Sequence, residues 1–335
     1  MDIVKLVIGL TLLTFGGDFL VKGGSAIAKM FKVSSLVIGL TVVAFGTSAP
    51  ELLVSLQAAI GGKPDIAVGN VIGSNIANIA LILGLTAIFQ PIPICRQSII
   101  IDWPMMFIST VAFSLFAFDN NISRFEGIIL AAALFACVFF QFAYSRKKMK
   151  KLSPDIKEED EKQPALWLAI LFVILSCFAL AYGAKLLIEG ASNIASKLGV
   201  SQRIIAVTVV ALGTSLPELA TSVIAAIKKE SDIAIGNIIG SNMFNILCVI
   251  GFSAIFTPIK VSWSEFKVDY IWMLITSILL LVLILPIFKL IKERKHIEQC
   301  ANKNGKFIVN NGKLGVGGGI ILLATYIYYV VSVLL

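Results

Sequence analysis

The sequence has little charge. Of its 335 residues only 14% are charged, against about 25% in soluble domains, while 58% are hydrophobic and the mean hydropathy is +0.93. This composition excludes a soluble domain, and it excludes a disordered chain, which needs low hydrophobicity and high net charge. If each membrane span takes about 20 apolar residues, the chain has room for about ten. We therefore predict an all-α polytopic protein of the lipid bilayer.

Histidine and clustered cysteine are also missing. The single histidine, His296, lies in a basic stretch, and the five cysteines are scattered singly. This pattern excludes a disulfide framework and a zinc site, and it leaves an intramembrane enzyme without a histidine base or an HExxH motif. We therefore expect no enzymatic activity and no cofactor. The net charge of +8, which would suggest nucleic-acid binding in a soluble protein, is typical of Lys/Arg-rich cytoplasmic loops in a membrane protein. We expect neither a nucleic-acid partner nor an obligate protein partner.

Stretches without charge locate the spans. Two stretches would be charge-free except for one residue each, Glu51 and Glu218. An N-terminal stretch is apolar apart from Lys5, Asp18 and Lys22. The ten predicted spans are 3–28, 33–62, 66–95, 104–118, 127–145, 165–184, 204–227, 233–259, 270–288 and 314–335.

Two long polar loops set the orientation. Residues 146–163 and 289–313 follow the fifth and ninth spans, so they lie on the same side of the membrane. Loops on that side carry 19 Lys/Arg residues and loops on the other side carry 7. Because positively charged loops stay inside, we predict that both long loops are cytoplasmic. Both termini are then outside, in a protein of the cell membrane.

The chain contains an internal repeat. Shifting it by 167 residues aligns 33–92 with 200–259 without a gap, and 34 of the 60 positions are identical. Each half therefore holds five spans, 1–145 and 164–335, joined by the linker 146–163. Because five is odd, the second half crosses the membrane in the opposite sense. Inverted repeats are typical of secondary transporters whose site lies at the midplane between the halves, whereas a channel rarely needs one.

The same polar motif occurs in both halves. GTSAPEL at 46–52 is followed by GNVIGSN at 69–75, and GTSLPEL at 213–219 by GNIIGSN at 236–242. The proline breaks a helix at mid-membrane, where freed backbone is tolerated only if protein covers it or it lines a cavity. A carboxyl at this depth is a functional candidate by default. The candidates from this motif are Glu51 and Glu218, the hydroxyls of Thr47, Ser48, Thr214 and Ser215, and the carbonyls around Ala44, Thr47, Ala211 and Thr214. Ser74 with Asn78, and Ser241 with Asn245, repeat the four-residue offset on the next span.

Other residues have structural interpretations. The hydroxyls beside the prolines can instead bond freed backbone. The GxxxG pairs Gly69/Gly73 and Gly236/Gly240 favour close helix packing. Asn70, Asn75, Asn237 and Asn242 fit either hydrogen bonding between helices or a role in the site. Asp18/Lys22 and Lys185/Glu189 are four-apart pairs that neutralise one another on a helix.

The chemistry of these groups is hard-cation binding. Two carboxylates with hydroxyl, amide and carbonyl oxygens, and no sulfur or imidazole, favour Ca²⁺, Mg²⁺ or Na⁺ over zinc or copper. Calcium takes about six to eight oxygens in flexible geometry. The charge of Glu51 and Glu218 neutralises one Ca²⁺, and several monovalent ions can share the same ligands.

With these motifs the sequence resembles the cation/calcium exchanger superfamily, in particular its prokaryotic sodium/calcium exchanger branch. The resemblance covers essentially the whole chain. It implies that spans two, three, seven and eight form the ion-binding core and that the first and sixth spans slide against it. The implied ligands are Ala44, Thr47, Ser48, Glu51, Ser74, Asn78, Ala211, Thr214, Ser215, Glu218, Ser241 and Asn245.

The resemblance implies a sodium/calcium antiporter with electrogenic exchange. The proton-coupled branch typically has GNxxE where this chain has GTSxPE, which favours sodium as the driving ion. Asn245 stands where some sodium-coupled relatives have aspartate, and where the potassium-dependent branch uses aspartate to help hold potassium, so we predict potassium-independent exchange. Proton-driven calcium exchange and a passive calcium channel are the alternatives.

Overall fold

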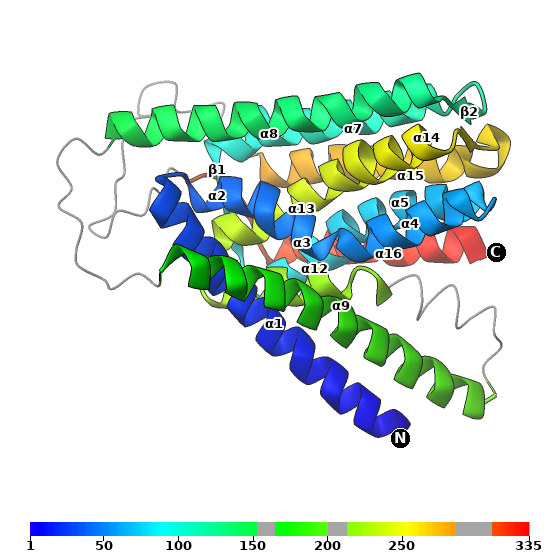
Figure 1. The fold of residues 1–335 in the computed structure, drawn as a ribbon, viewed down its shortest axis with the longest axis horizontal. Coiled ribbons are helices and arrows are strands. Elements are labelled where there is room, and N and C mark those ends of the chain that lie inside the picture. The colour runs from blue at the N-terminus through cyan, green and yellow to red at the C-terminus, as the bar shows by residue number, and fades with distance from the viewer. Residues whose placement is uncertain (153–164, 200–212, 286–309, 335) are drawn as a thin grey trace.

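The computed structural model describes residues 1–152, 165–199, 213–285 and 310–334, and most of these residues are helical. Most helices run side by side along the long axis of the molecule, whereas α1 and α9 cross obliquely along one flank (Figure 1). In the first half the elements are α1 (Asp2–Phe31), α2 (Ser35–Ile38), η1 (Gly39–Val43), α3 (Ala44–Thr47), α4 (Ala49–Ile60), α5 (Pro64–Ile76), η2 (Ala77–Leu83), α6 (Gly84–Phe89), β1 (Ile92–Cys95), η3 (Ser98–Asp102), α7 (Trp103–Phe116), β2 (Asn121–Ile122) and α8 (Arg124–Leu152), where η marks a π-helical segment. In the second half they are α9 (Leu166–Lys197), α12 (Leu216–Ile227), α13 (Ser231–Phe244), η5 (Asn245–Ile250), α14 (Gly251–Phe256), β3 (Ile259–Lys260), α15 (Trp263–Ile284), β4 (Asn310–Leu314) and α16 (Val316–Leu334).

The helices confirm a polytopic membrane protein. Within the described ranges, eight helices are long and apolar enough to cross a membrane, and the bent pair Ser35–Thr47 and Ala49–Ile60 makes a ninth span. The predicted span 204–227 lies partly outside the described residues. Its described end is the short apolar helix α12. His296 and most of the two long loops also lie outside the described residues.

The helix breaks where the proline motif predicts it. The two parts of the bent span meet at 48°, and Ser48 between them has φ −83° and ψ 4°. Pro50 follows in the first turn of α4, where a missing N–H costs nothing. Ser215, 167 residues later, has φ −87° and ψ 5° ahead of Pro217. The repeated sequence therefore produces the same local backbone in both halves.

Two short strand pairs make the all-α prediction incomplete. β1 pairs antiparallel with β4, and β2 pairs antiparallel with β3. In each pair, a segment between two helices of the first half is bonded to a segment between two helices of the second half. The strands therefore link the two halves outside their helices.

Glycines bring helices of the two halves into close contact. A Cβ on Gly9 of α1 would lie 2.8 Å from the carbonyl oxygen of Gly183 in α9, and a Cβ on Gly23 would lie 3.0 Å from that of Ala169. As the residue number rises on one helix it falls on the other, so α1 and α9 are antiparallel. The packing places glycines of one helix against the backbone of the other, as is common between membrane helices.

The last helix of each half packs on the other half. A Cβ on Gly127 of α8 would lie 2.8 Å from the carbonyl oxygen of Gly251, and a Cβ on Gly319 of α16 would lie 2.6 Å from that of Gly84. Gly84 and Gly251 are 167 residues apart, so the two contacts correspond to one another. Neither half is therefore a separate bundle.

The GxxxG prediction is confirmed for one pair. A Cβ on Gly236 or Gly240 of α13 would meet the carbonyl oxygen of Leu36 at 2.7 Å or of Leu40 at 2.5 Å. These contacts press α13 against α2 and η1. For Gly69 the nearest described atom would be 3.6 Å away, in Phe266, so close packing at that pair is not confirmed.

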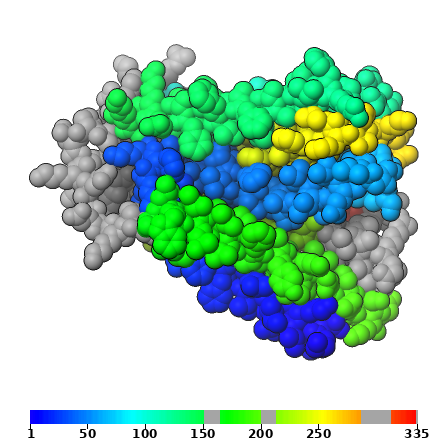
Figure 2. Space-filling model, in the orientation of Figure 1, coloured from blue at the N-terminus to red at the C-terminus, as the bar shows by residue number. Residues whose placement is uncertain are grey.

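The outer surface is apolar along the spans. Phe139 on α8, Leu53 on α4 and Phe178 on α9 are 76%, 59% and 71% exposed. Figure 2 shows these three helices on one face, with α14 between α8 and α4. A continuous surface of exposed apolar side chains fits contact with lipid tails rather than with water.

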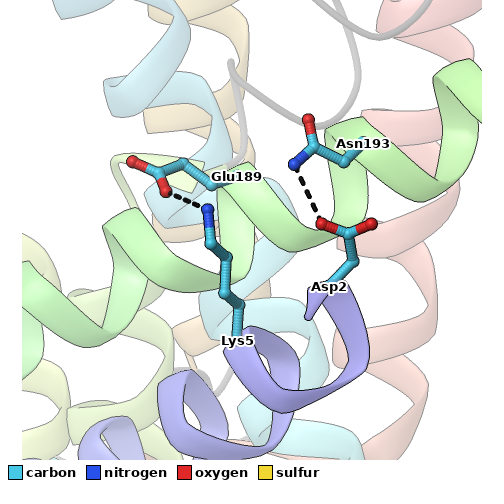
Figure 3. Close-up of polar contacts among 4 residues, drawn as sticks. All are labelled: Asp2, Lys5, Glu189 and Asn193. Atoms are coloured by element: carbon cyan, nitrogen blue, oxygen red, sulfur yellow. Dashed lines mark hydrogen bonds and ion pairs between the residues drawn. The ribbon is translucent and has the colours of Figure 1, made fainter.

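Ion pairs hold α1 near its start and at its middle. Asp18 pairs with Lys22 at 2.8 Å, as predicted, and also with Lys228 after α12. The predicted partner of Glu189 is wrong, because its carboxylate pairs at 2.8 Å with Lys5 (Figure 3) rather than with Lys185. The antiparallel packing brings the first turns of α1 beside the last turns of α9, and a partner across the interface replaces the one along the helix.

Candidate ion-binding site

The two carboxyls of the repeated motif lie at the two helix breaks. Glu51 is in the first turn of α4 and Glu218 in the first turn of α12, and both side chains are fully buried. Among the described residues no lysine, arginine or histidine pairs with either carboxyl. A buried carboxylate without a cationic partner is strongly unfavourable, so these positions favour a bound cation.

Glu218 is contacted by both halves of the chain. Its Oε1 accepts a hydrogen bond from the Ser48 hydroxyl at 3.0 Å and one from the Ser241 hydroxyl at 3.4 Å. Ser48 stands at the break of the first half, and Ser241 belongs to α13. The cluster is therefore shared between the two halves, as a site between repeats requires.

Thr47 links the same cluster to α13. Its hydroxyl donates to Oδ1 of Asn237 at 3.1 Å and lies 3.4 Å from the Ser241 hydroxyl. It also lies 3.3 Å from the carbonyl of Ala44, which accepts the backbone N–H of Ser48. The hydroxyl thus has local backbone bonding, as the structural interpretation expected, together with contacts inside the cluster.

Asn70 and Asn237 brace the two carboxyl-bearing turns. The Asn237 amide donates to the Ser222 hydroxyl at 3.0 Å and to the backbone carbonyl of Glu218 at 3.5 Å. Its match in the first half, Asn70, donates to Ser55 at 2.9 Å and to the carbonyl of Glu51 at 3.4 Å. The same bonds fix α12 on α13 and α4 on α5.

The carboxyl of Glu51 has a different environment. Neither of its oxygens has a hydrogen-bond partner among the described residues, and the same holds for the hydroxyls of Ser74, Thr214 and Ser215. Thr214 and Ser215 lie close to the Glu51 carboxyl without forming a hydrogen bond to it. These unbonded oxygens are available to a cation. Ala211 lies outside the described residues.

Asn78 and Asn245 stand at corresponding places in two π-helical segments, η2 and η5. Each donates through its amide nitrogen to an asparagine of the other half. The carbonyl oxygen of each side chain has no donor among the described residues. π-Helical segments are frequent at functional sites, and here they present two more oxygens.

Several contacting residues were not predicted. Ser55 and Ser222 match in the repeat alignment, and both are buried behind the carboxyls. Met106 and Met273 are also 167 residues apart, but they lie beyond the block that aligns most clearly. Extending the alignment into the fourth span of each half would have indicated them.

The cluster contains only oxygen donors. Among the described residues, no three His, Cys, Asp or Glu side chains gather as a metal site, so the donors beyond the two carboxylates are hydroxyl, amide and backbone oxygens. A cavity of about 10 Å³ borders this cluster at Ser48, but its other lining residues are apolar or cysteine, namely Phe45, Ala49, Leu52, Phe244, Cys248 and Val249. The cavity therefore lies beside the oxygen cluster and is not itself a cation site.

Membrane-spanning helices assembled around this buried oxygen cluster define a polytopic protein of the kind that carries ions. The chain belongs to the sodium/calcium exchanger protein family, whose model matches residues 2–143 and 168–335. It is 36% identical over 320 residues to the sodium/calcium exchanger MaX1 of Methanosarcina acetivorans, covering 85% of this chain and 91% of that protein. It is 34% identical over 282 residues to the inner membrane protein YrbG of Escherichia coli, covering 83% and 87%. Its fold is similar to the solved structure of the sodium–calcium exchanger NCX_Mj, with a TM-score of 0.78, 29% identity and coverage of 99% and 98%.

Proposed function

We propose that this protein is a sodium/calcium antiporter of the alternating-access type. One Ca²⁺ and several Na⁺ compete for the same oxygens at Glu51, Glu218 and their neighbouring hydroxyls and amides. Because two carboxylates neutralise one Ca²⁺ while the further oxygens accommodate more than two Na⁺, exchange is electrogenic. The two five-helix halves, 1–145 and 164–335, are inverted repeats of ten spans in all.

The observation that carries this proposal is the bond from Ser48 to Glu218. It joins the helix break of one half to the carboxyl of the other at 3.0 Å, in a cluster that no basic residue among the described ones neutralises. A cation bound there touches both halves at once. It can therefore couple its own occupancy to a rearrangement between them.

The proposed ligands are the twelve residues of the repeated motifs. Those described as buried with at least one unbonded oxygen are Glu51, Ser74, Asn78, Ser215, Glu218 and Asn245. Thr47, Ser48 and Ser241 already bond within the cluster, and they exchange those bonds for a cation. The remaining three are Ala44, Ala211 and Thr214.

The test is calcium uptake into proteoliposomes that contain the purified protein. An imposed Na⁺ gradient is expected to drive uptake, and a pH gradient is not. Uptake driven by the pH gradient alone would establish proton-driven exchange instead. Calcium entry without either gradient would establish a passive channel. A voltage imposed across the same vesicles changes the rate of uptake if the exchange moves net charge.

We also propose that residues 146–163 and 289–313 are cytoplasmic and that both termini lie outside. The Lys/Arg distribution supports this orientation, and Figure 1 places both termini at one end of the molecule. A cysteine replacing Glu158, in a chain without its native cysteines, should react with an impermeant thiol reagent only after the cells are opened. Labelling in intact cells would contradict the orientation.

A further inference from the structure

Four asparagines link the two halves where α5–η2 meets α13–η5. Asn75 of α5 donates its amide N–H to the backbone carbonyl of Asn242 at 3.4 Å, and Asn242 donates to the carbonyl of Asn75 at 3.2 Å. The second N–H group of each points at a methionine sulfur of the fourth spans, Met273 at 3.7 Å and Met106 at 3.8 Å. All four asparagines are 0–2% exposed, so bulk solvent does not reach them.

The backbone carbonyls determine which way these amides point. A carbonyl only accepts, so the nitrogen of Asn75 must face Asn242 and the nitrogen of Asn242 must face Asn75. Their side-chain oxygens are then turned to the opposite side. The Oδ1 of Asn75 accepts from Asn245 at 3.1 Å, and the Oδ1 of Asn242 accepts from Asn78 at 3.0 Å.

These hydrogen bonds also fix the side-chain orientation of the two predicted ligands, Asn78 and Asn245. Because an Oδ1 only accepts, Asn78 and Asn245 must present their nitrogens to Asn242 and Asn75. Their own Oδ1 atoms then point away from these partners, and neither has a donor among the described residues. Asn245 follows Ser241 by four residues, one helical turn, and Ser241 bonds Glu218. A reversed amide would instead present N–H groups, which repel a cation.

We propose that Asn75 and Asn242 are positioning residues that orient the amide oxygens of Asn245 and Asn78 toward the transported cation. The inference rests on the proposed function, since it concerns the same site. Each positioning residue acts on the ligand of the opposite half: Asn75 on Asn245 and Asn242 on Asn78. The neighbours within one half, Asn75 and Asn78, are not bonded to one another.

The pairing across the halves makes the proposal testable by double-mutant cycles. Alanine at position 75 removes the side chain that holds Asn245 but keeps the backbone carbonyl that holds Asn242. The substitution therefore removes the hydrogen bond that orients Asn245 and leaves the bonds that orient Asn242 and Asn78 in place. The measurement is the Kd for CaCl₂, by calorimetry on the purified full-length protein.

In an otherwise unchanged protein, Asn75→Ala should raise the Kd for Ca²⁺ about five- to tenfold, the size of one neutral hydrogen bond. In the Asn245→Ala background the same substitution should change the Kd less than about twofold, because the ligand it orients is gone. In the Asn78→Ala background it should keep its full effect. The equivalent cycles start from Asn242, which holds Asn78. The effect of Asn242→Ala on the Kd should be largely lost in the Asn78→Ala background and unchanged in the Asn245→Ala background.

Equal effects of Asn75→Ala in the Asn245→Ala and Asn78→Ala backgrounds would overturn the proposal, because a residue that only packs helices has no preference for the opposite half. If Asn75→Ala does not yield folded protein, the same cycles with Asn75→Ser decide the question, since serine is too short to reach Asn245. A wild-type protein that binds no Ca²⁺ would overturn the proposed function itself. Calcium binding without coupling would overturn only this inference.

Discussion

Two antiparallel helix contacts relate the halves of this protein, and they are built differently. Where α5–η2 meets α13–η5, buried asparagines donate to one another's carbonyls across the interface. Where α1 meets α9, glycines bring the backbones together, and the hydrogen bonds between side chains of the two helices stand near one end, as at Lys5 and Glu189. The first contact is therefore held by hydrogen bonds of fixed geometry, whereas the second is held mainly by close packing of the two backbones.

The difference indicates which parts can move. Buried hydrogen bonds specify one register, because breaking one leaves polar groups unsatisfied. The α1–α9 pair contacts the rest of the protein mainly through apolar side chains, such as Ile38 and Val43 beside Gly24, together with the Asp18–Lys228 ion pair. This difference fits the prediction made from the family resemblance, in which α1 and α9 slide together against a fixed core that contains the asparagine-linked helices.

The largest effect is expected in the core. Glu51→Gln or Glu218→Gln removes one of the two charges facing Ca²⁺ and replaces an oxygen ligand by an N–H donor. Sodium-driven Ca²⁺ uptake should fall at least about 100-fold, since losing a charged partner in a buried site costs about 3–5 kcal/mol. Uptake into proteoliposomes is the measurement.

The matched control is Glu189→Gln, at the α1–α9 contact, where the carboxylate is 40% exposed and pairs with Lys5. It should leave Ca²⁺ uptake within about twofold of wild type, because exposed pairs contribute little. Near-normal uptake in either core variant, or loss of uptake in the control, would remove the distinction between the two regions.

A smaller but decisive effect is expected from crosslinks. A Cβ on Gly24 would lie 3.3 Å from Cγ2 of Val43, close enough for a disulfide between cysteines at these positions. In a chain without native cysteines, this link between α1 and the core should lower exchange more than about tenfold, and reduction should restore it. Calcium binding should persist, because the ligands are untouched.

The comparison crosslink joins α1 to α9. A Cβ on Gly183 would lie 2.9 Å from Cβ of Leu12 and 3.0 Å from the carbonyl oxygen of Gly9. Because a disulfide needs a Cβ–Cβ distance of about 3.5–4.5 Å, α1 and α9 must shift slightly apart to accept cysteines at positions 12 and 183. Exchange in the oxidised Leu12→Cys/Gly183→Cys protein should stay within about twofold of its reduced form. If this link also stops exchange, α1 and α9 do not move as one unit.

Much of the fold was predictable because charge is so costly in a membrane that charge-free stretches mark the spans. The helix break was predictable because Pro50 cannot donate a hydrogen bond, and the backbone angles at Ser48 confirm it. The chemistry of the cluster was predictable because the motif appears twice.

The partners of these residues were not predictable. Glu189 pairs with Lys5 rather than Lys185 because the depth to which α1 packs against α9 depends on glycine contacts, and no local spacing encodes them. For the same reason the alignment indicated that Asn75 and Asn242 are equivalent but not that each contacts the other. The short strands escaped prediction because two to five residues carry too little pattern.

A modest effect is expected where α1 meets the end of α12. Lys228→Gln removes the ion pair to Asp18, whose side chain is 25% exposed, an interaction worth about 0.2–1 kcal/mol. Turnover in proteoliposomes should change by less than about fivefold while the Kd for Ca²⁺ stays the same. A changed Kd would mean that this ion pair acts on the core rather than on the sliding unit.

The smallest expected effect is that of potassium. Among the described residues of the oxygen cluster only Glu51 and Glu218 can carry charge, and one Ca²⁺ neutralises both. Asn245 adds an oxygen without charge, and its nitrogen is engaged by Asn75. A K⁺ ion bound beside Ca²⁺ would leave an uncompensated positive charge in a medium of low dielectric, which is costly. Sodium-driven Ca²⁺ uptake should therefore be the same, within about twofold, in potassium-free and potassium-containing buffer.

Asn245→Asp supplies the missing charge but places a carboxyl oxygen next to the side-chain oxygen of Asn75. This variant should therefore be sensitive to potassium only when Asn75 is also replaced by alanine. Loss of wild-type uptake on removal of potassium would refute the charge balance assigned to the core.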